Sequence, residues 1–289
     1  MRKENIHMVD INELSFSQKA EIADYIKRDN LTIVNHKLKP AEVKDSFYTR
    51  YGKRCIDIVF SLLALIVTAP INLVLAVITF FDVGCPVLFH QKRIGIEGRK
   101  FTIYKFRNMT NETDANGELL PPSQRVTKWG KIARKTSLDE LLNFVSVLKG
   151  DMSIIGPRPL LDYYFERLSD RHKTIYKVRP GLECPAPQHV DHCLSWQERL
   201  DNYVWYAENC SFMLDVRLLF RMVAIALDRR STSSRSQAKT GGLMGYDTDG
   251  NVIYTKAVPD RFVDEFLTTH GYKSIDEAVA DRYSERNCA

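Results

Sequence analysis

The chain has 289 residues, enough for the core of one or two domains, and its 44% hydrophobic and 27% charged residues are ordinary for a globular protein. Lys and Arg exceed Asp and Glu by 41 to 36, and the resulting charge of +5 is too small to indicate a nucleic-acid partner. The six cysteines form no CxxC pair, which favours a reducing compartment, and residues 1–10 lack the apolar segment of a cleavable signal peptide.

The first 50 residues are polar and are expected to form an N-terminal extension. Residues 15–28 carry Ile22, Tyr25 and Ile26 at helical spacing, which predicts an amphipathic helix.

Residues 56–81 form an apolar stretch in which Asp57 is the one charged side chain. Pro70 lies near its middle, where it removes a helical hydrogen bond and clashes with the preceding turn. At about 1.5 Å per residue the two arms are about 21 and 16 Å long, so each crosses about one leaflet of a bilayer core roughly 30 Å thick. Pro70 therefore favours two helical arms separated by a break.

Basic residues flank this stretch on both sides, and the positive-inside rule places both flanks in the cytoplasm. A re-entrant helix satisfies that rule, whereas a straight spanning helix does not. The spanning helix stays open as an alternative, because prolines also occur in such helices. The flanking residues are Arg50, Lys53 and Arg54 before the stretch and Lys92, Arg93, Arg99 and Lys100 after it.

A small domain of mixed helices and strands is expected after the apolar stretch. Residues 87–91 and 101–106 predict two short strands around a turn at residues 95–98. Such a hairpin would carry several of the basic side chains named above.

Residues 137–148 predict an amphipathic helix with apolar side chains at helical spacing. Ser137 is the expected N-cap, Glu140 stands at the third helical position, and Gly150 is expected to end the helix.

Residues 195–229 predict two further helices rich in aromatic and basic residues, which suit either a membrane interface or an ordinary core. Residues 231–240 are polar and Ser-rich and predict a linker. Beyond them, residues 247–251 predict a hairpin turn, and residues 259–269 and 274–284 predict short helices.

Two basic clusters, within residues 91–107 and 125–135, suit the binding of phosphates on lipids or on soluble ligands. The adjacent carboxylates Asp139 and Glu140 follow them. Such a pair often merely favours a helix N-terminus, but a carboxylate can also attack phosphorus, and its neighbour can hold Mg²⁺. The clusters comprise Lys92, Arg93, Arg99, Lys100, Lys105 and Arg107, and then Arg125, Lys128, Lys131, Arg134 and Lys135.

A series of short motifs between residues 51 and 229 is specific in its order, although each motif alone is weak. In chain order they are Lys53-Arg54 with Asp57 and Ser61, Pro70, Gly84 with Pro86-Val87 and Phe89, residues 91–95, Gly98 with Lys100-Phe101, residues 105–107 with Met109, residues 136–141, 148–153, 156–159 and 179–181, and residues 194–196 onward to Asp215. In this combination the chain resembles the monotopic phosphoglycosyl transferases, the bacterial sugar transferase family.

The resemblance implies a mainly helical α/β fold, in which a re-entrant membrane helix-break-helix precedes a small cytoplasmic catalytic domain with amphipathic interfacial helices. It implies a membrane break at Pro70 and a catalytic pair in which Asp139 is the covalent nucleophile and Asp139 and Glu140 bind Mg²⁺. It assigns substrate binding to further positions, namely Gln91, Arg93, Lys105, Arg107, Pro157, Arg158, Pro159 and Arg179. Arginine suits such positions because its planar fork donates two hydrogen bonds to phosphate.

The implied reaction transfers a sugar-1-phosphate from a nucleotide diphospho-sugar, expected to be a UDP-sugar, to polyprenyl phosphate. It would be the first membrane step of bacterial polysaccharide or glycoconjugate assembly, at the cytoplasmic face of the inner membrane. The expected partners are the nucleotide sugar, polyprenyl phosphate and the bilayer; nucleic acid is not expected, and homo-oligomerisation stays open.

The implied organisation is an N-terminal extension at residues 1–50, a transferase domain at 51–230 with the re-entrant helix at 54–82, and a linker and C-terminal extension at 231–289. The chain departs from the family pattern at residues 182–190. This departure puts the geometry of that loop and the donor specificity in question.

Three alternatives remain at this stage. An inactive membrane adaptor could retain the fold, although the intact Asp139-Glu140 pair argues against it. A single-pass anchor could carry an unrelated soluble domain. Cys and His residues within the altered loop could bind zinc, although their spacing is unusual and a polar loop is the simpler reading. These residues are Cys184, His189, His192 and Cys193.

Overall fold

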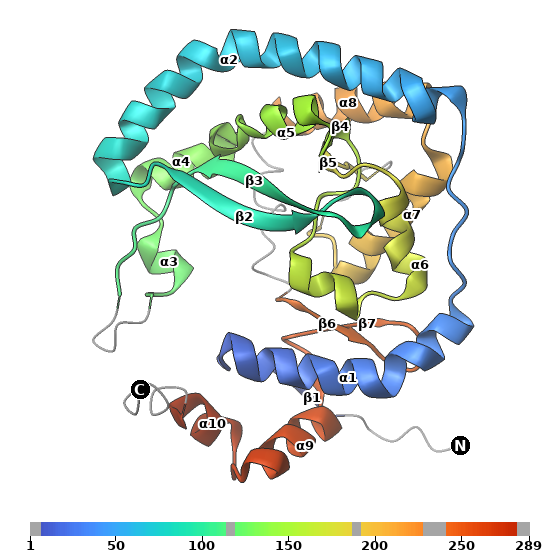
Figure 1. The fold of residues 1–289 in the computed structure, drawn as a ribbon. Helices are drawn as coiled ribbons and strands as arrows, with labels where there is room; N and C mark the ends of the chain where they lie inside the picture. Colours follow the sequence, from blue (N-terminus) through green and yellow to red (C-terminus); the bar gives the residue numbers. More distant parts are fainter. Residues whose placement is uncertain (1–6, 114–118, 187–191, 228–240, 282–289) are drawn as a thin grey trace.

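The computed structural model describes residues 7–113, 119–186, 192–227 and 241–281. Helices dominate this part of the chain, and its strands pair into small two-stranded sheets. The mainly helical class expected from the sequence is therefore confirmed, and one long apolar helix stands apart from the rest (Figure 1).

This helix, α2 (Lys53–Val83), follows a short π-helical turn, η1 (Tyr48–Gly52). The helical stretch 48–83 is long and apolar enough to cross a membrane, yet only 11% of its most apolar window is buried. Figure 1 shows α2 arched over the remainder of the molecule. Most of the large apolar side chains of this helix are exposed. Val67 and Leu73, for example, are each 69% exposed.

The inner face of α2 is polar. Lys53, Asp57 and Ser61 are buried and recur every four residues, which places them on one side of the helix. A helix on the surface of a soluble protein has its apolar side chains buried and its polar side chains exposed, whereas α2 has the opposite arrangement. Such an arrangement is expected where lipid covers the outer face of a helix.

The helix continues through Pro70 as a single helix, so the break expected at this residue is wrong as a break in helical conformation. Pro70 has no N–H for the preceding turn, but nearby polar side chains supply local hydrogen bonds. The Thr68 hydroxyl donates to the Ala64 carbonyl over 2.7 Å, and the Asn72 amide donates to Thr68 Oγ1 over 3.3 Å. The proline therefore lies within an arched helix (Figure 1).

The hairpin predicted after α2 is present. Strands β2 (Leu88–Ile94) and β3 (Lys100–Phe106) pair antiparallel around the 3₁₀ turn η2 (Ile96–Gly98). The hairpin lies below the arch of α2 in Figure 1 and begins near the C-terminal end of that helix.

The helix predicted at residues 137–148 is divided, and the prediction of Ser137 as its N-cap is wrong. After α3 (Pro122–Arg125) and α4 (Lys128–Thr136), Ser137 adopts a left-handed conformation with φ 57° and ends α4. A 3₁₀ turn, η3 (Leu138–Glu140), follows, and then α5 (Asn143–Lys149), which Gly150 ends as predicted. The left-handed residue redirects the chain, so a single helix cannot form.

The central core lies below α5. It includes a parallel pair, β4 (Ser153–Ile155) and β5 (Gly181–Glu183), and the predicted helices α7 (Trp196–Asn209) and α8 (Phe212–Leu227). Short helical segments connect these elements, namely η4 (Asp162–Arg167), α6 (Asp170–Lys173) and η5 (Thr174–Lys177).

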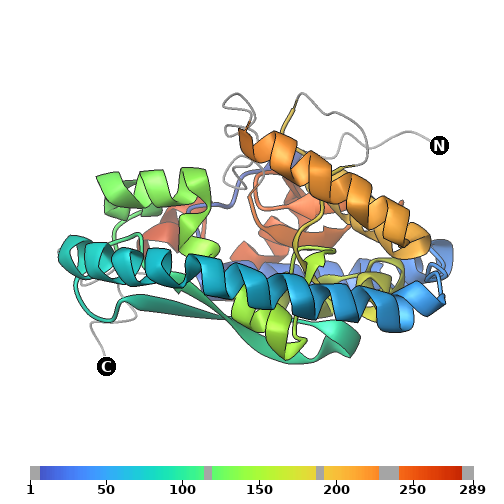
Figure 2. The same ribbon diagram turned by 90° about the horizontal axis from the view of Figure 1, so that it is seen from above.

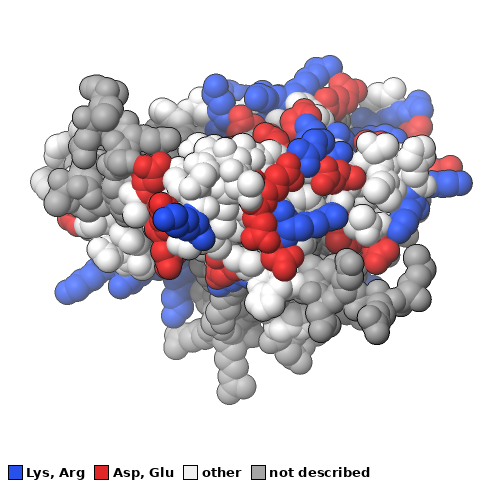
Figure 3. Space-filling view, turned by 90° about the horizontal axis from the view of Figure 1, so that it is seen from below, with Lys and Arg blue, Asp and Glu red and all other residues white. Residues whose placement is uncertain are grey.

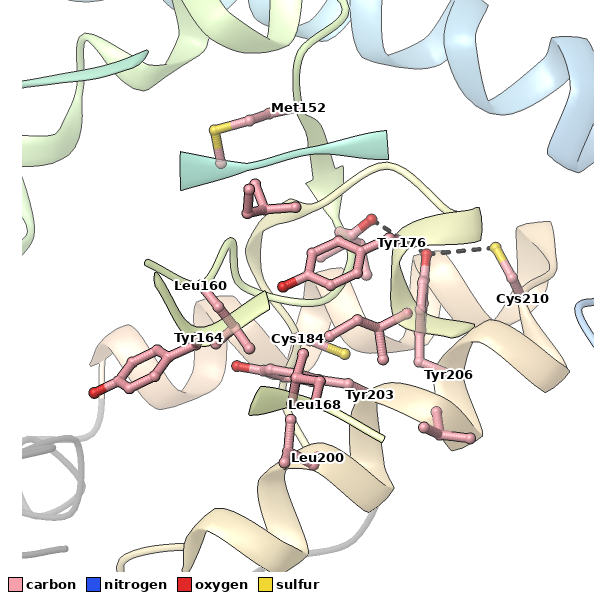
Figure 4. Packing of buried hydrophobic residues seen from close by; sticks show 14 of the residues in the cluster. Met152, Leu160, Tyr164, Leu168, Tyr176, Cys184, Leu200, Tyr203, Tyr206 and Cys210 are labelled. Carbon is pink, nitrogen blue, oxygen red and sulfur yellow. Dashed lines mark hydrogen bonds between the residues drawn. The ribbon is translucent and has the colours of Figure 1, made fainter. Parts of the chain in front are cut away.

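Figure 4 shows how tyrosines and leucines fill this core. The Tyr206 hydroxyl donates to Asp215 Oδ1 over 2.7 Å, and the Ile155 carbonyl oxygen lies 3.2 Å from the same hydroxyl, so this buried polar group is satisfied. Helix α7 is thus a core helix, whereas Phe220 on α8 is 72% exposed. Figure 2 shows α8 and α4 on the same upper side of the molecule as α2.

The segments before η1 and after residue 240 pack together. The N-terminal elements are β1 (Met8–Val9) and α1 (Phe16–Lys37), capped by Ser15. The C-terminal elements are the predicted hairpin of β6 (Leu243–Tyr246) and β7 (Val252–Tyr254), then β8 (Val258–Pro259), α9 (Asp260–His270) and α10 (Ile275–Asp281). The linker predicted at residues 231–240 lies outside the described residues.

Strand β1 pairs with β8, and a second apolar core joins Ile22 and Ile26 of α1 to Phe262 and Phe266 of α9. The two ends of the chain therefore form one unit on the side opposite α2 (Figure 1). Figure 3 shows that this lower face mixes acidic and basic side chains, unlike the outer face of α2.

Candidate active site

Two basic side chains from separate segments converge on Glu140. Lys105 Nζ, from the end of β3, lies 2.5 Å from Glu140 Oε1. Arg158 Nη2, from the loop after β4, lies 2.5 Å from the same oxygen. The structure thus brings together three of the predicted site residues, and it does so at a partly buried position where charges interact strongly.

Asp139 is in a different environment from its neighbour. It is only 5% exposed, and Asn108 Nδ2 donates a hydrogen bond to its Oδ2 over 2.8 Å. Asn108 is neutral, and within the described ranges no charged side chain forms a salt bridge with Asp139. The two adjacent carboxylates are therefore held by different kinds of donor.

The pKa values of Asp139 and Glu140 are shifted in opposite directions. Burial raises the pKa of Asp139, and the charge of Glu140 raises it again. Burial also disfavours the charge of Glu140, but Arg158 and Lys105 outweigh that penalty and hold its pKa at about 2. Burial lowers the pKa of Lys105, and Glu140 opposes this shift. Opposite shifts in adjacent acids are a common sign of divided chemical roles.

The backbone conformation at Ser137 sets the position of Asp139 and Glu140. Ser137, with its φ of 57°, redirects the chain from α4 into η3, which presents Asp139 towards the end of β3. A non-glycine residue in this region costs about 1 kcal/mol or more and persists where the surroundings enforce it, commonly near functional sites.

The Pro157-Arg158-Pro159 loop is fixed from both sides. Gly156 and Gly181 approach so closely that a Cβ on Gly156 would lie 2.5 Å from the Arg179 carbonyl oxygen. On the other side, Arg93 Nη1 donates to the Pro159 carbonyl over 3.0 Å and Arg93 Nη2 donates to Gln91 Oε1 over 2.6 Å.

Burial, followed by the nearby charge of Arg158, lowers the pKa of Arg93 to about 10. Gln91 and Arg93 thus border the loop, and they link the β2–β3 hairpin to it.

Two predicted binding residues donate hydrogen bonds to backbone carbonyls instead of to Glu140. Arg107 Nη1 donates to the Pro86 carbonyl over 2.9 Å, in the connection between α2 and β2. Arg179 Nε donates to the Gly150 carbonyl over 3.2 Å, after α5. Both side chains therefore hold backbone in this structure, and their role towards a ligand stays a prediction.

The structure adds three residues that the sequence patterns did not single out individually. Asn108 contacts Asp139, Arg134 contacts Asn108, and Glu183 Oε2 lies 3.4 Å from Arg158 Nη1. Glu183 belongs to the segment that departs from the family pattern. Arg134 lies in the second basic cluster, but an asparagine such as Asn108 gives no periodic or charge signal.

The Asp139-Glu140 pair has the chemistry of a Mg²⁺ site that is completed by substrate phosphates. Mg²⁺ is commonly held by one or two carboxylates together with phosphate oxygens. Glu140 Oε1 accepts from both basic side chains, which leaves Oε2 and the Asp139 carboxylate as oxygen donors. The residues present therefore fit such an ion.

The zinc alternative is weaker on this geometry. Burial raises the pKa of the Cys184 thiol well above its usual value, which disfavours the thiolate that zinc requires. His192 instead contacts Glu198 over 2.8 Å, and His189 lies outside the described residues. Within the described ranges no group of three or more metal-ligating side chains gathers.

Comparison with known proteins places this site in a family. The profile described as "Bacterial sugar transferase" matches residues 48–229. An uncharacterized sugar transferase, EpsL, of Bacillus subtilis is 40% identical over 167 residues, which cover 58% of this chain and 83% of that protein.

Two other relatives have names that state an activity. A UDP-N-acetylgalactosamine-undecaprenyl-phosphate N-acetylgalactosaminephosphotransferase of Aeromonas hydrophila is 34% identical, over 61% of this chain. An undecaprenyl-phosphate galactose phosphotransferase of Salmonella typhimurium is 32% identical, over 63% of this chain. The chain spans 43% and 41% of the lengths of these two proteins. These matches confirm the predicted resemblance and the prediction of an enzyme: the chain belongs to the bacterial sugar transferase family.

Proposed function

We propose that this chain is a phosphoglycosyl transferase that moves a sugar-1-phosphate from a UDP-sugar to polyprenyl phosphate. The observation that carries the proposal is the convergence of Lys105 and Arg158 on Glu140, directly beside the buried Asp139. The names of the relatives from Aeromonas hydrophila and Salmonella typhimurium, both undecaprenyl-phosphate sugar phosphotransferases, support the acceptor and the reaction type.

In the first half-reaction, a carboxylate oxygen of ionised Asp139 attacks the sugar-linked phosphorus. An oxygen–phosphorus bond forms, the phosphoanhydride bond breaks, and UMP leaves with the electron pair. Lys105 and Arg158, which Glu140 holds in place, bind the diphosphate oxygens and balance their charge. Bound Mg²⁺, held by Asp139 and Glu140, would supply further neutralisation of the phosphate charge.

In the second half-reaction, an oxygen of polyprenyl phosphate attacks the same phosphorus. The bond to Asp139 breaks, the carboxylate is restored, and polyprenyl diphospho-sugar is released. A covalent intermediate suits this substrate pair because two anionic phosphates, one of them confined to a membrane, need never meet directly.

The contacts of α2 support a re-entrant, monotopic arrangement. At one end, Asp57 Oδ1 accepts from Ser153 Oγ over 3.0 Å and from the Ile154 amide over 3.1 Å. At the other end, the Thr127 hydroxyl donates to Asp82 Oδ2 over 2.6 Å. Both ends therefore contact the same domain, which a straight helix across a bilayer would not allow, and the proposed location of that domain is the cytoplasmic face.

The inactive adaptor finds no support among these observations, since the acidic pair and Arg158 are present and converge. The test is a donor screen: the detergent-purified full chain, Mg²⁺, polyprenyl phosphate and one nucleotide sugar at a time, with release of nucleoside monophosphate as the signal. We expect release from at least one UDP-sugar and none from the Asp139→Asn variant. Equal release by the variant, or no release from any UDP-sugar, would overturn the proposal.

A further inference from the structure

Asn108 is the one residue among those described whose side chain donates a hydrogen bond to Asp139. Its own orientation is fixed, because Arg134 Nε and Nη2 both donate to Asn108 Oδ1, over 3.0 and 2.8 Å. If the amide were reversed, its NH₂ group would face the guanidinium and its oxygen would face the carboxylate, which are two repulsive contacts. The direction of the two hydrogen-bonded contacts is therefore fixed: Arg134 donates to Asn108, and Asn108 donates to Asp139.

The backbone of Asn108 is held as firmly as its side chain. Helix α4 packs so closely on it that a Cβ on Gly130 would lie 2.1 Å from the Asn108 carbonyl oxygen. The absence of a side chain at Gly130 permits this approach. The same helix carries Arg134, so α4 holds both the backbone and the amide of Asn108.

The two carboxylate oxygens of Asp139 therefore differ in their hydrogen bonds. Oδ2 accepts from Asn108, and Oδ1 receives no hydrogen bond from any other side chain in the ranges described. A neutral amide orients the carboxylate of Asp139 without the direct ion pairs that Lys105 and Arg158 form with Glu140.

We propose that Asn108, held by Arg134, is a positioning residue that fixes Oδ2 of Asp139 and leaves Oδ1 as the oxygen that attacks phosphorus. This inference rests on the proposed covalent mechanism. While Asp139 carries the phosphosugar, Oδ2 is a carbonyl oxygen and still accepts the Asn108 hydrogen bond. When polyprenyl phosphate displaces the carboxylate, negative charge returns to both oxygens and the hydrogen bond strengthens.

The two half-reactions should therefore respond differently to Asn108→Ala. Loss of orientation slows both, but loss of the donor also removes stabilisation of the departing carboxylate in the second. Because a hydrogen bond to a charged group contributes about 1.5–3 kcal/mol, we expect the breakdown of the adduct to slow about 10- to 100-fold. Formation should slow less, so the phosphosugar adduct should accumulate during turnover.

The Asn108→Asp variant distinguishes a positioning role of Asn108 from a packing role. It preserves the size of the side chain and its contact with Arg134, but at neutral pH it places a second carboxylate against Asp139 Oδ2. A packing role predicts that Asp is tolerated better than Ala, whereas the positioning role predicts the reverse order. The matched control is Asn209→Ala, at an exposed residue whose amide donates to the Trp205 carbonyl outside the site.

The experiment is rapid-quench kinetics of the full chain in detergent, with a radiolabelled UDP-sugar shown to be a donor, scoring adduct and lipid product separately. We expect Asn108→Ala to hold a larger steady-state fraction of adduct than the wild type, and Asn108→Asp to be the slower variant. Unchanged kinetics in Asn108→Ala, or equal slowing of both steps together with Asp tolerated better than Ala, would overturn the positioning role. Absence of any adduct in the wild type would instead refute the covalent mechanism itself.

Discussion

Lys53 Nζ lies 2.5 Å from Asp215 Oδ2, and this buried ion pair joins the start of α2 to helix α8. The Tyr48 and Tyr206 hydroxyls also donate to the Asp215 carboxylate, so its charge is well compensated. Buried pairs are costly to break, because the remaining partner keeps its charge without compensation.

Asp215→Asn should therefore destabilise the protein by about 3–5 kcal/mol, because Lys53 would stay buried without its counter-charge. Denaturant unfolding in detergent, followed by circular dichroism, measures this change. Asp45→Asn is the matched control, since Asp45 pairs with Arg50 at an exposed position and the variant should keep the wild-type midpoint. Equal midpoints for the two variants would show that the buried pair does not secure α2.

Labelling can test the topology of α2 in intact cells. In a cysteine-free variant, Asp45→Cys and Arg99→Cys place single thiols on either side of the helix. Both thiols should resist an impermeant reagent in intact cells and react after permeabilisation, because both ends of α2 contact one domain, which we propose lies at the cytoplasmic face. Labelling of either thiol from outside contradicts the re-entrant arrangement.

Pro70→Leu restores the missing backbone donor in α2 and should straighten the arch. We expect a fraction of molecules to adopt a spanning state, seen as labelling of the Arg99→Cys thiol from outside the cell. A labelling pattern identical to that of the unsubstituted parent would show that Pro70 does not determine the topology.

Arg158→Lys should weaken donor binding although the charge is kept. The Arg158 guanidinium reaches Glu140 through Nη2 and the Leu182 carbonyl and Glu183 through Nη1, and an ammonium cannot reproduce this fork. We expect the KM for the nucleotide sugar to rise about 10-fold or more. Arg171→Lys is the control, because Arg171 lies away from the pair, beside Glu208. An unchanged KM removes Arg158 from the donor site.

The acid sensitivity of folding should depend on Glu140. Its pKa of about 2 lies below the usual 4.5, so its ionised form stabilises the fold. That contribution is complete above about pH 4.5 and is lost as the pH falls through about 2. The difference in unfolding free energy between the wild type and Glu140→Gln should thus shrink across this window in a series of denaturant titrations. A constant difference would show that Lys105 and Arg158 do not set the pKa of Glu140.

Local sequence patterns predicted much of this fold. Patterns that extend over only a few residues predict the β2–β3 hairpin, the two helices after Ser195 and the end of α5 at Gly150. These patterns are the spacing of apolar residues, the capping residues of helices and the conformational freedom of glycine. The prediction of Ser137 as an N-cap is wrong because a serine before an apolar periodic run has the pattern of an N-cap, whereas this residue adopts a left-handed conformation and ends α4.

The charged members of the site were predictable, as were the motif residues beside them, such as Gln91 and Pro159. Lys105, Glu140 and Arg158 carry chemistry that can be recognised in the residues themselves, and motif order links them. Asn108 lies 31 residues from Asp139, so its role depends on tertiary contacts that periodicity cannot indicate. The packing of the two chain ends into one unit depends in the same way on distant residues, such as those joined by β1 and β8.

Nucleophilic attack by Asp139 is the central claim, and trapping of the adduct tests it most directly. The full chain is incubated with Mg²⁺ and an active UDP-sugar in the absence of lipid acceptor, and peptides are then analysed by mass spectrometry. Ping-pong chemistry predicts release of about one equivalent of UMP per protein and a phosphosugar on the peptide that contains Asp139. Asp139→Asn should abolish both signals. Release of UMP only when polyprenyl phosphate is present, with no adduct on Asp139, would contradict the account and indicate direct transfer between the two substrates.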